Sequence, residues 1–123
     1  MKYKISVSVA LVVLLAAGTV WAHHSTVDME DKAVTLTGTL TKINWKNPHI
    51  EFSVEVKNDK GQAESWLIDG APPNRFAIRK IGKVDFEKAI GQTVVVEARP
   101  ARDGSRRARL SKITFPDGRV ALV

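Results

Sequence analysis

The chain has 123 residues, 44% of them hydrophobic and 26% charged, with a formal net charge of +6. This length fits one domain, and the composition is that of an ordinary folded domain rather than of a disordered or fibrous chain. The chain has no cysteine, which excludes a disulfide scaffold, a thiol nucleophile, an iron–sulfur cluster and every thiolate metal site.

Residues 1–22 have the three-part pattern of a secretory signal peptide. Lys2 and Lys4 form a positive start, an almost wholly apolar run continues to Ala17, and small or branched residues lead to Ala22. A retained membrane anchor is the weaker alternative, because about 13 apolar residues fall short of the ~20 needed to span a bilayer. We therefore expect cleavage after Ala22 and export to the periplasm, with no transmembrane segment after cleavage.

Residues 23–32 are polar and lack periodicity, so we interpret them as an N-terminal arm before a domain that spans residues 33–123. From Ala33 onward, apolar and polar residues alternate as in a strand, and the apolar phase slips by one after Thr41. Such a slip indicates a β-bulge, which lets one long strand serve two sides of a curled sheet. Gly38 lies on the apolar face, where it suggests a bend or bulge.

The same alternation predicts four more strands and a short terminal one, at residues 49–57, 62–69, 92–100, 106–115 and 119–123. A helix is expected over residues 72–81, with Gly82 as its stop, and Asp85 is placed to cap one more helical turn. The last long strand slips phase between Leu110 and Ile113. This order predicts an all-β domain with one short helix, a five-stranded OB-like Greek-key barrel, rather than a sandwich.

In that barrel the first strand pairs with the second and the fourth, and the helix closes one end. Phe52 and Trp66 lie in the apolar phase of their strands, so we expect both in the core rather than on a nucleic-acid stacking surface.

Several segments carry a family resemblance: His23-His24-Ser25, Trp45-Lys46-Asn47-Pro48-His49, Pro73-Asn74, Gly91, Asp103-Gly104-Ser105 and Pro116-Asp117-Gly118-Arg119. In these segments the chain resembles a family of small secreted bacterial proteins of unknown function. The resemblance covers the mature chain. It implies a small exported domain and supplies no established activity.

All three histidines lie in two places, His23-His24 and His49. After cleavage behind Ala22, the α-amine and imidazole of His23 would chelate a metal ion, His49 would add a third nitrogen and His24 would assist. Such nitrogens suit Cu(II) best among the common divalent ions. The pattern therefore predicts one copper ion, and the open alternative is a solvated tail with His49 merely starting a strand.

Positive charge concentrates in the hairpin between the fourth and fifth predicted strands, at Arg99, Arg102, Arg106, Arg107 and Arg109. A basic surface of this kind attracts anionic lipid headgroups or polyanionic envelope sugars. Export makes nucleic acid an unexpected partner. The candidate ligand-binding residues are Trp45, Asn47, Asp69, Arg99, Arg102, Arg107 and Arg109, and the alternative is a solvated hairpin that keeps the domain soluble.

Motifs for catalysis are missing: the sequence has no G-x-S-x-G elbow, no phosphate-cradling glycine loop and no H-E-x-x-H. We therefore expect an exported binding module rather than an enzyme, with copper-dependent oxidation as the enzymatic alternative. The envelope-interaction protein with an arginine-rich face is the alternative to the copper module. The sequence leaves the oligomeric state open.

Overall fold

The computed structural model describes residues 28–123, so the expected signal peptide and His23-His24 lie outside the described residues. Three strands, two short helices and three more strands follow one another along the chain: β1 (Val34–Asn44), β2 (Glu51–Lys57), β3 (Ala63–Asp69), α2 (Pro73–Ala77), α3 (Lys83–Ala89), β4 (Thr93–Pro100), β5 (Arg107–Thr114) and β6 (Val120–Leu122). Each predicted strand is present, with ends that differ by two residues or fewer.

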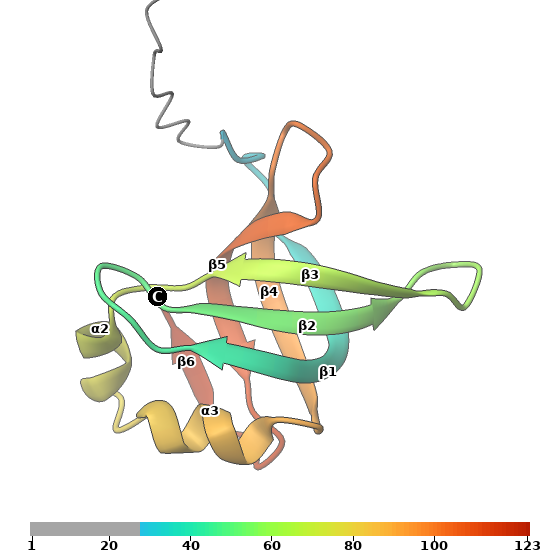
Figure 1. The fold of residues 1–123 in the computed structure, drawn as a ribbon. Coiled ribbons are helices and arrows are strands. Elements are labelled where there is room, and N and C mark those ends of the chain that lie inside the picture. The colour runs from blue at the N-terminus through green and yellow to red at the C-terminus, as the bar shows by residue number, and fades with distance from the viewer. Residues whose placement is uncertain (1–27) are drawn as a thin grey trace, which may run out of the picture.

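The strands close into a barrel (Figure 1). β1 pairs antiparallel with β2 on one side and with β4 on the other, as the sequence predicts. β2 continues to β3, β4 continues to β5, and a parallel pairing between β3 and β5 completes the ring. β6 adds one strand outside the ring, on β5. This order is that of the five-stranded OB-type barrel, which confirms the predicted fold class.

Both predicted phase slips are β-bulges. On β1 the register with β2 shifts between Leu40 and Lys42, which leaves Thr41 as the extra residue. On β5 the partners of Glu97 and Ala98 are Lys112 and Leu110, so Ser111 is the extra residue there. A bulge bends its strand and increases the local twist, and these two bends let β1 and β5 each join both sides of the barrel.

Gly38 has a different role from the expected bulge. Its pairing with Val94 on β4 is regular. A Cβ at this position would collide with the backbone carbonyl oxygen of Glu55 on β2. The glycine therefore permits a close approach of the β1 and β2 backbones at the point where β1 changes partner.

The expected helix over residues 72–81 is shorter than predicted, because α2 covers only Pro73–Ala77. α2 ends at Ala77, and Lys80 adopts a φ of 58°, which no right-handed helix can contain. Gly82 then precedes α3, and the Asp85 carboxylate accepts a 2.8 Å hydrogen bond from the Gly82 N–H. Asp85 thus caps the extra helical turn as predicted. That turn is α3, which is longer than α2.

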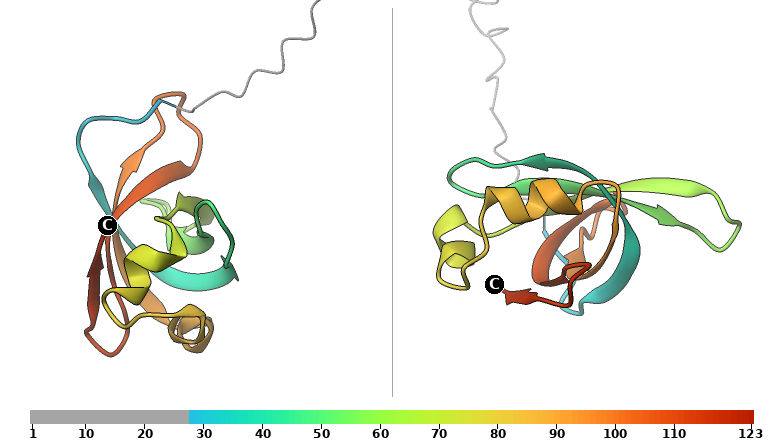
Figure 2. Two further views of the ribbon diagram at one scale, coloured as in Figure 1. Left: turned by 90° about the vertical axis from the view of Figure 1, so that its left-hand side faces the viewer. Right: turned by 90° about the horizontal axis from the view of Figure 1, so that it is seen from below.

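Both helices cover one end of the barrel (Figure 2). Each contributes a fully buried aromatic ring, Phe76 from α2 and Phe86 from α3. The Phe86 ring lies at the centre of an aromatic cluster, with ring centroids 5.6 Å from Phe52 and 5.0 Å from Phe115. Edge-on and tilted rings at these distances are favourable aromatic pairs. The expectation that Phe52 belongs to the core is confirmed, and Trp66 packs against the same core.

Within residues 28–123, no helix has the length and apolar character that crossing a membrane requires.

Candidate functional site

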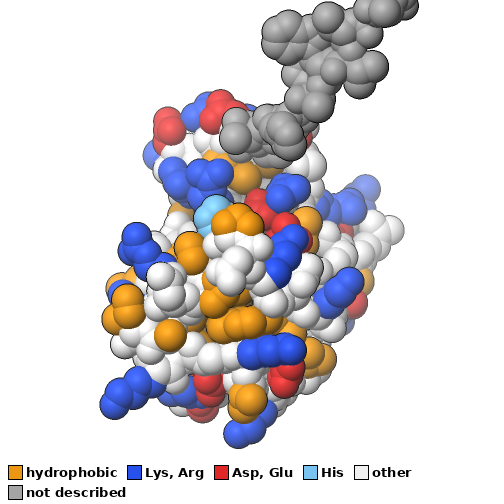
Figure 3. All heavy atoms as spheres, turned by 60° about the vertical axis from the view of Figure 1, so that its left-hand side comes forward, with side chains coloured by type: hydrophobic (Ala, Val, Ile, Leu, Met, Phe, Trp, Pro, Cys, Tyr) orange, Lys and Arg blue, Asp and Glu red, His pale blue; other side chains and the backbone are white. Residues whose placement is uncertain are grey.

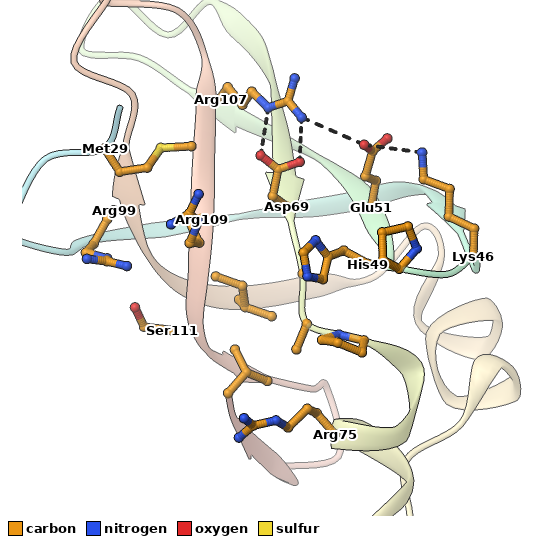
Figure 4. Close-up of a pocket in the computed structure, with 16 residues that line it drawn as sticks. Met29, Lys46, His49, Glu51, Asp69, Arg75, Arg99, Arg107, Arg109 and Ser111 are labelled. Carbon is orange, nitrogen blue, oxygen red and sulfur yellow. Dashed lines mark hydrogen bonds and ion pairs between the residues drawn. The ribbon is translucent and has the colours of Figure 1, made fainter. Parts of the chain in front are cut away.

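An open cavity of about 760 Å³ lies on the outside of the barrel, where the chain leaves β3 for α2 and passes β5 (Figure 4). Its lining comes from the loop before β2, the ends of β2 and β3, α2, β4 and β5. Strand alternation explains the polar part of this lining, because residues two apart on a strand share a face. Arg107 and Arg109 on β5 point outward, while Ala108 between them is buried.

In one part of the cavity, cationic and acidic side chains form a network of ion pairs. The Nε and Nη2 atoms of Arg107 donate hydrogen bonds of 2.7 Å each to the two carboxylate oxygens of Asp69. Arg107 also lies 3.8 Å from a Glu51 oxygen, and the Lys46 Nζ lies 3.4 Å from the same oxygen. The hydrogen bond to Asp69 raises the pKa of Arg107, which burial alone would lower. Both carboxylates of the cavity are therefore occupied by protein cations.

Another part of the cavity carries cations that form no ion pair with any of residues 28–123. Arg99 on β4 and Arg109 on β5 are direct cross-strand partners, and Arg75 comes from α2. Among residues 28–123, none of these three guanidinium groups has an ion pair or a side-chain hydrogen bond. Residues 1–27 contain no Asp or Glu, so that segment has no carboxylate side chain to offer.

Directly opposed like charges destabilise a strand pair. The Arg99–Arg109 pair is therefore unfavourable by itself. The other cross-strand partner of Arg109 is Asp69, whose two carboxylate oxygens already accept hydrogen bonds from Arg107. An anion in the cavity would relieve the repulsion and form charge-assisted hydrogen bonds with both guanidinium groups.

His49 is exposed at the same cavity, between Pro48 and the buried Ile50. Figure 4 shows its ring directed into the cavity on the side of β5. The space-filling view in Figure 3 shows a histidine at the surface with Lys and Arg side chains on one side and carboxylates on the other. The predicted polar orientation of His49 is thus correct.

The fold brings five of the predicted site residues to the cavity: His49, Asp69, Arg99, Arg107 and Arg109. Trp45 lies elsewhere, half-buried, with its ring centroid 5.8 Å from that of Phe86. Asn47 is exposed outside the lining.

Arg102 serves the arm instead of the cavity. Its guanidinium lies within 3.5 Å of carboxylate oxygens of Asp28, Glu30 and Asp31. Its Nε also donates a 3.0 Å hydrogen bond to the Met29 carbonyl oxygen. These contacts attach the start of the described chain to the β4–β5 hairpin, beside the bridge between Met29 and Ala101.

Sequence reasoning missed four lining residues that matter to the chemistry: Met29, Lys46, Glu51 and Arg75. Glu51 had a usable signal, because it is two residues from His49 on the same face of a predicted strand. Met29 and Arg75 had none, since they lie in irregular chain or on a very short helix whose orientation depends on the packing of Phe76.

Within the described part of the chain, no group of three His, Asp or Glu side chains is arranged to hold a metal ion. His49 is the single histidine there, and the other two candidate copper ligands fall outside it.

The sequence profile of a family of unknown function, DUF6152, matches residues 10–110. The chain belongs to this family. The match confirms the resemblance to an uncharacterised family and includes most of the cavity, from Met29 to Leu110. No curated protein and no solved structure gives a significant match to the chain. Membership of DUF6152 therefore adds no activity, and the function must be argued from the site itself.

Proposed function

We propose that this DUF6152 protein is an exported binding module that holds an anionic ligand in the cavity beside β5. The observation that carries the proposal is the Arg99–Arg109 pair, two opposed cations that form no ion pair among the described residues, since Asp69 beside Arg109 is bound by Arg107. Five cationic side chains line the cavity against two acidic side chains, and a hollow with an excess of one sign of charge concentrates ions of the other sign.

A titration with inorganic phosphate at low salt tests this proposal. Chemical shifts of backbone amides on β4 and β5 should move, and Arg109→Ala should weaken the apparent affinity by about fivefold or more, because each charge-assisted contact contributes substantially. Arg79→Ala is the matched control, since Arg79 is an exposed arginine outside the cavity. Equal affinities in wild type and Arg109→Ala would contradict the proposal.

Copper binding is the second candidate, and one observation favours it. Met29 and His49 line the same cavity, and His23 precedes Met29 by six residues. An extended chain of that length spans ~20 Å at ~3.3 Å per residue, so the reach supports a site shared by His23 and His49. The cationic lining ranks this candidate second, because it favours an anion and opposes a second cation nearby.

The copper candidate has its own test. The processed protein should bind Cu(II) tightly, and both His49→Ala and a single Met added before His23 should weaken binding sharply. The added residue moves the α-amine out of chelating position. Unchanged Cu(II) affinity in His49→Ala would point to a local His23-His24 peptide site. Unchanged Cu(II) affinity in the Met-extended form would exclude the α-amine as a ligand.

Export rests on the signal-peptide pattern of residues 1–22. The mature periplasmic protein should begin at His23, which N-terminal sequencing of the exported form can establish. A protein that retains Met1 would contradict export and the α-amine ligand together, while the anion site would be unaffected because its residues lie between Arg75 and Arg109.

A further inference from the structure

The cavity is much larger than an inorganic anion. Its volume of about 760 Å³ falls within the range of roughly 300–1,000 Å³ that holds small organic ligands. A water molecule takes up only about 30 Å³ of liquid volume, so a bare phosphate or sulfate would leave most of the space filled with solvent. The size of the cavity indicates a ligand that has a body as well as a charged group.

The arrangement of charge indicates what that charged group is. Arg99 and Arg109 oppose each other across two strands, and a single group between them can meet both guanidinium forks. A phosphate monoester carries a charge of about −1.5 to −2 and three acceptor oxygens. It therefore neutralises two arginines and accepts from both, while a carboxylate has one charge and two oxygens. Arg75 adds a third positive charge to the potential of the site.

The remaining wall indicates the nature of the body. The lining residues without labels in Figure 4 are apolar residues and one glycine, and some of them lie between Arg75 and Arg109. Ala71, Pro72 and Val123 are partly exposed there, so an apolar group could cover them and be removed from water. Asp69, the β3 cross-strand partner of Arg109, and Glu51 both already interact with Arg107. A phosphate in this part of the cavity therefore meets Arg99 and Arg109, which have no ion pair among residues 28–123.

We infer that the ligand is a phosphate monoester attached to an apolar body, an inference that rests on the proposed anion site. The phosphate binds between Arg99 and Arg109, and the body packs on the apolar wall beside Val123. This chemistry has two sources, a soluble organic phosphate or the headgroup of phosphatidic acid in a membrane.

Calorimetric titrations with phenyl phosphate, inorganic phosphate and benzoate test the inference. Phenyl phosphate should bind about tenfold more tightly than inorganic phosphate, because the ring buries apolar surface. It should also bind about tenfold more tightly than benzoate, which carries the same ring and a single charge. Vesicles of phosphatidylcholine with and without phosphatidic acid form the membrane arm, and binding that requires phosphatidic acid and Arg109 would assign the lipid source.

Two variants separate the parts of the ligand. Val123→Ser should weaken phenyl phosphate and leave inorganic phosphate unchanged, with Leu122→Ser as the matched control because its exposed side chain lies outside the cavity. Arg109→Ala should weaken every phosphate probe. Val123 and Arg109 are both exposed, so circular dichroism of Val123→Ser and Arg109→Ala should show an unchanged fold.

The outcomes distinguish this inference from the function on which it rests. Equal affinities for phenyl phosphate and inorganic phosphate, without binding to phosphatidic acid, would overturn the apolar body and leave the anion site standing. Benzoate binding as tightly as phenyl phosphate would overturn the phosphate group. The absence of Arg109-dependent binding of any probe would overturn both the inference and the anion-binding function.

Discussion

At the scale of residues, the arginines of the β4–β5 hairpin differ in whether a carboxylate of the protein binds them. The β4–β5 hairpin and its flanks carry five arginines, and three of them have carboxylate partners: Arg102 with the arm, Arg106 with Glu64 and Arg107 with Asp69. A guanidinium group that is bound to a carboxylate offers fewer donors to a ligand, because some of its N–H groups already donate to that carboxylate. Arg99 and Arg109 have no ion pair with any of residues 28–123, and this difference decides which side chains carry the proposed function.

Asp69→Asn should strengthen anion binding. The change removes the charge that neutralises Arg107 and leaves one amide oxygen to accept from it, so phosphate affinity should rise about threefold or more. Stability at pH 7 should fall by about 1 kcal/mol, a reduced figure because the Arg107 side chain is 37% exposed. Calorimetric titration and urea unfolding measure the two effects.

Glu64→Gln is the matched control for Asp69→Asn. It releases Arg106, which pairs with Glu64 at 3.3 Å outside the cavity, so phosphate affinity should not change. A similar rise in both variants would mean that net charge, rather than the cavity, governs binding.

Asp85 gives the domain an acid-sensitive contact at α3. The hydrogen bond from the Gly82 N–H, followed by the bond from Arg119, lowers the pKa of Asp85 below its ordinary value of 3.8. A lowered pKa means that the ionised carboxylate stabilises the folded state above pH 3.8, and that this stabilisation is lost as the pH falls through the folded value.

Asp85→Ala should therefore lower the free energy of unfolding by about 1 kcal/mol at pH 7, the usual effect of losing a capping group. The difference from wild type should stay constant between pH 5 and 8 and shrink below 3.8. Urea titrations over this pH series provide the measurement. A difference that does not change with pH would show that the charge of Asp85 has no part in it.

At the scale of elements, β1 joins the two sides of the barrel, because it pairs with both β2 and β4. Its first half, through Thr39, pairs with β4, and its second half pairs with β2. The bulge at Thr41 and the close backbone approach at Gly38 lie within this change of partner. The loop before β2 and the outward face of β4 take their positions from β1, so His49 and Arg99 depend on it indirectly.

Gly38→Ala should disturb this junction more than any surface glycine change. The added Cβ would meet a carbonyl oxygen of the neighbouring backbone, which cannot turn aside as a flexible side chain can. We expect a loss of about 3 kcal/mol in the free energy of unfolding, at the upper end of ordinary overpacking. Chemical denaturation measures it.

Gly82→Ala is the control, because a Cβ at Gly82 meets no atom within 4 Å. Its effect should stay below about 1 kcal/mol, the cost of alanine at a helix N-cap. A loss below about 1 kcal/mol for Gly38→Ala would show that β1 and β2 separate there without strain.

At the scale of the whole molecule, an aromatic cluster holds the helical cover on the barrel. Phe86 contacts Phe52 from β2, Phe115 after β5, Phe76 from α2 and Trp45 from the loop before β2. Without disulfides, the domain depends on such packing for its stability. Because α2 also carries Arg75, the same cluster positions one wall of the cavity.

Phe52→Ala should destabilise the domain by ~3–5 kcal/mol, since Phe52 is 1% exposed and its removal leaves a cavity beneath Phe86. Thermal and urea unfolding should shift together, as expected for one cooperative domain. A loss under ~1 kcal/mol would place Phe52 outside the cooperative core.

Local pattern alone determined much of this protein. Strand alternation located all six strands, and two phase slips located the bulges at Thr41 and Ser111, because the period of two is a property of the extended backbone itself. The same alternation placed His49 outward and Phe52 inward. Motif resemblance led to a family of unknown function, which the profile match confirms.

Tertiary structure alone decided the extent of the helices and the composition of the site. The sequence places the division between the helices at Gly82, but the early end of α2 at Ala77 follows from the left-handed conformation at Lys80 and from burial of Phe76 and Phe86 against the barrel. The sequence showed five neighbouring arginines as one basic cluster. Only the closure of β3 against β5 brings Asp69 to Arg107, and only the β4–β5 register opposes Arg99 and Arg109. Electrostatic partners are chosen by distance in space, which the order of residues along a chain does not contain.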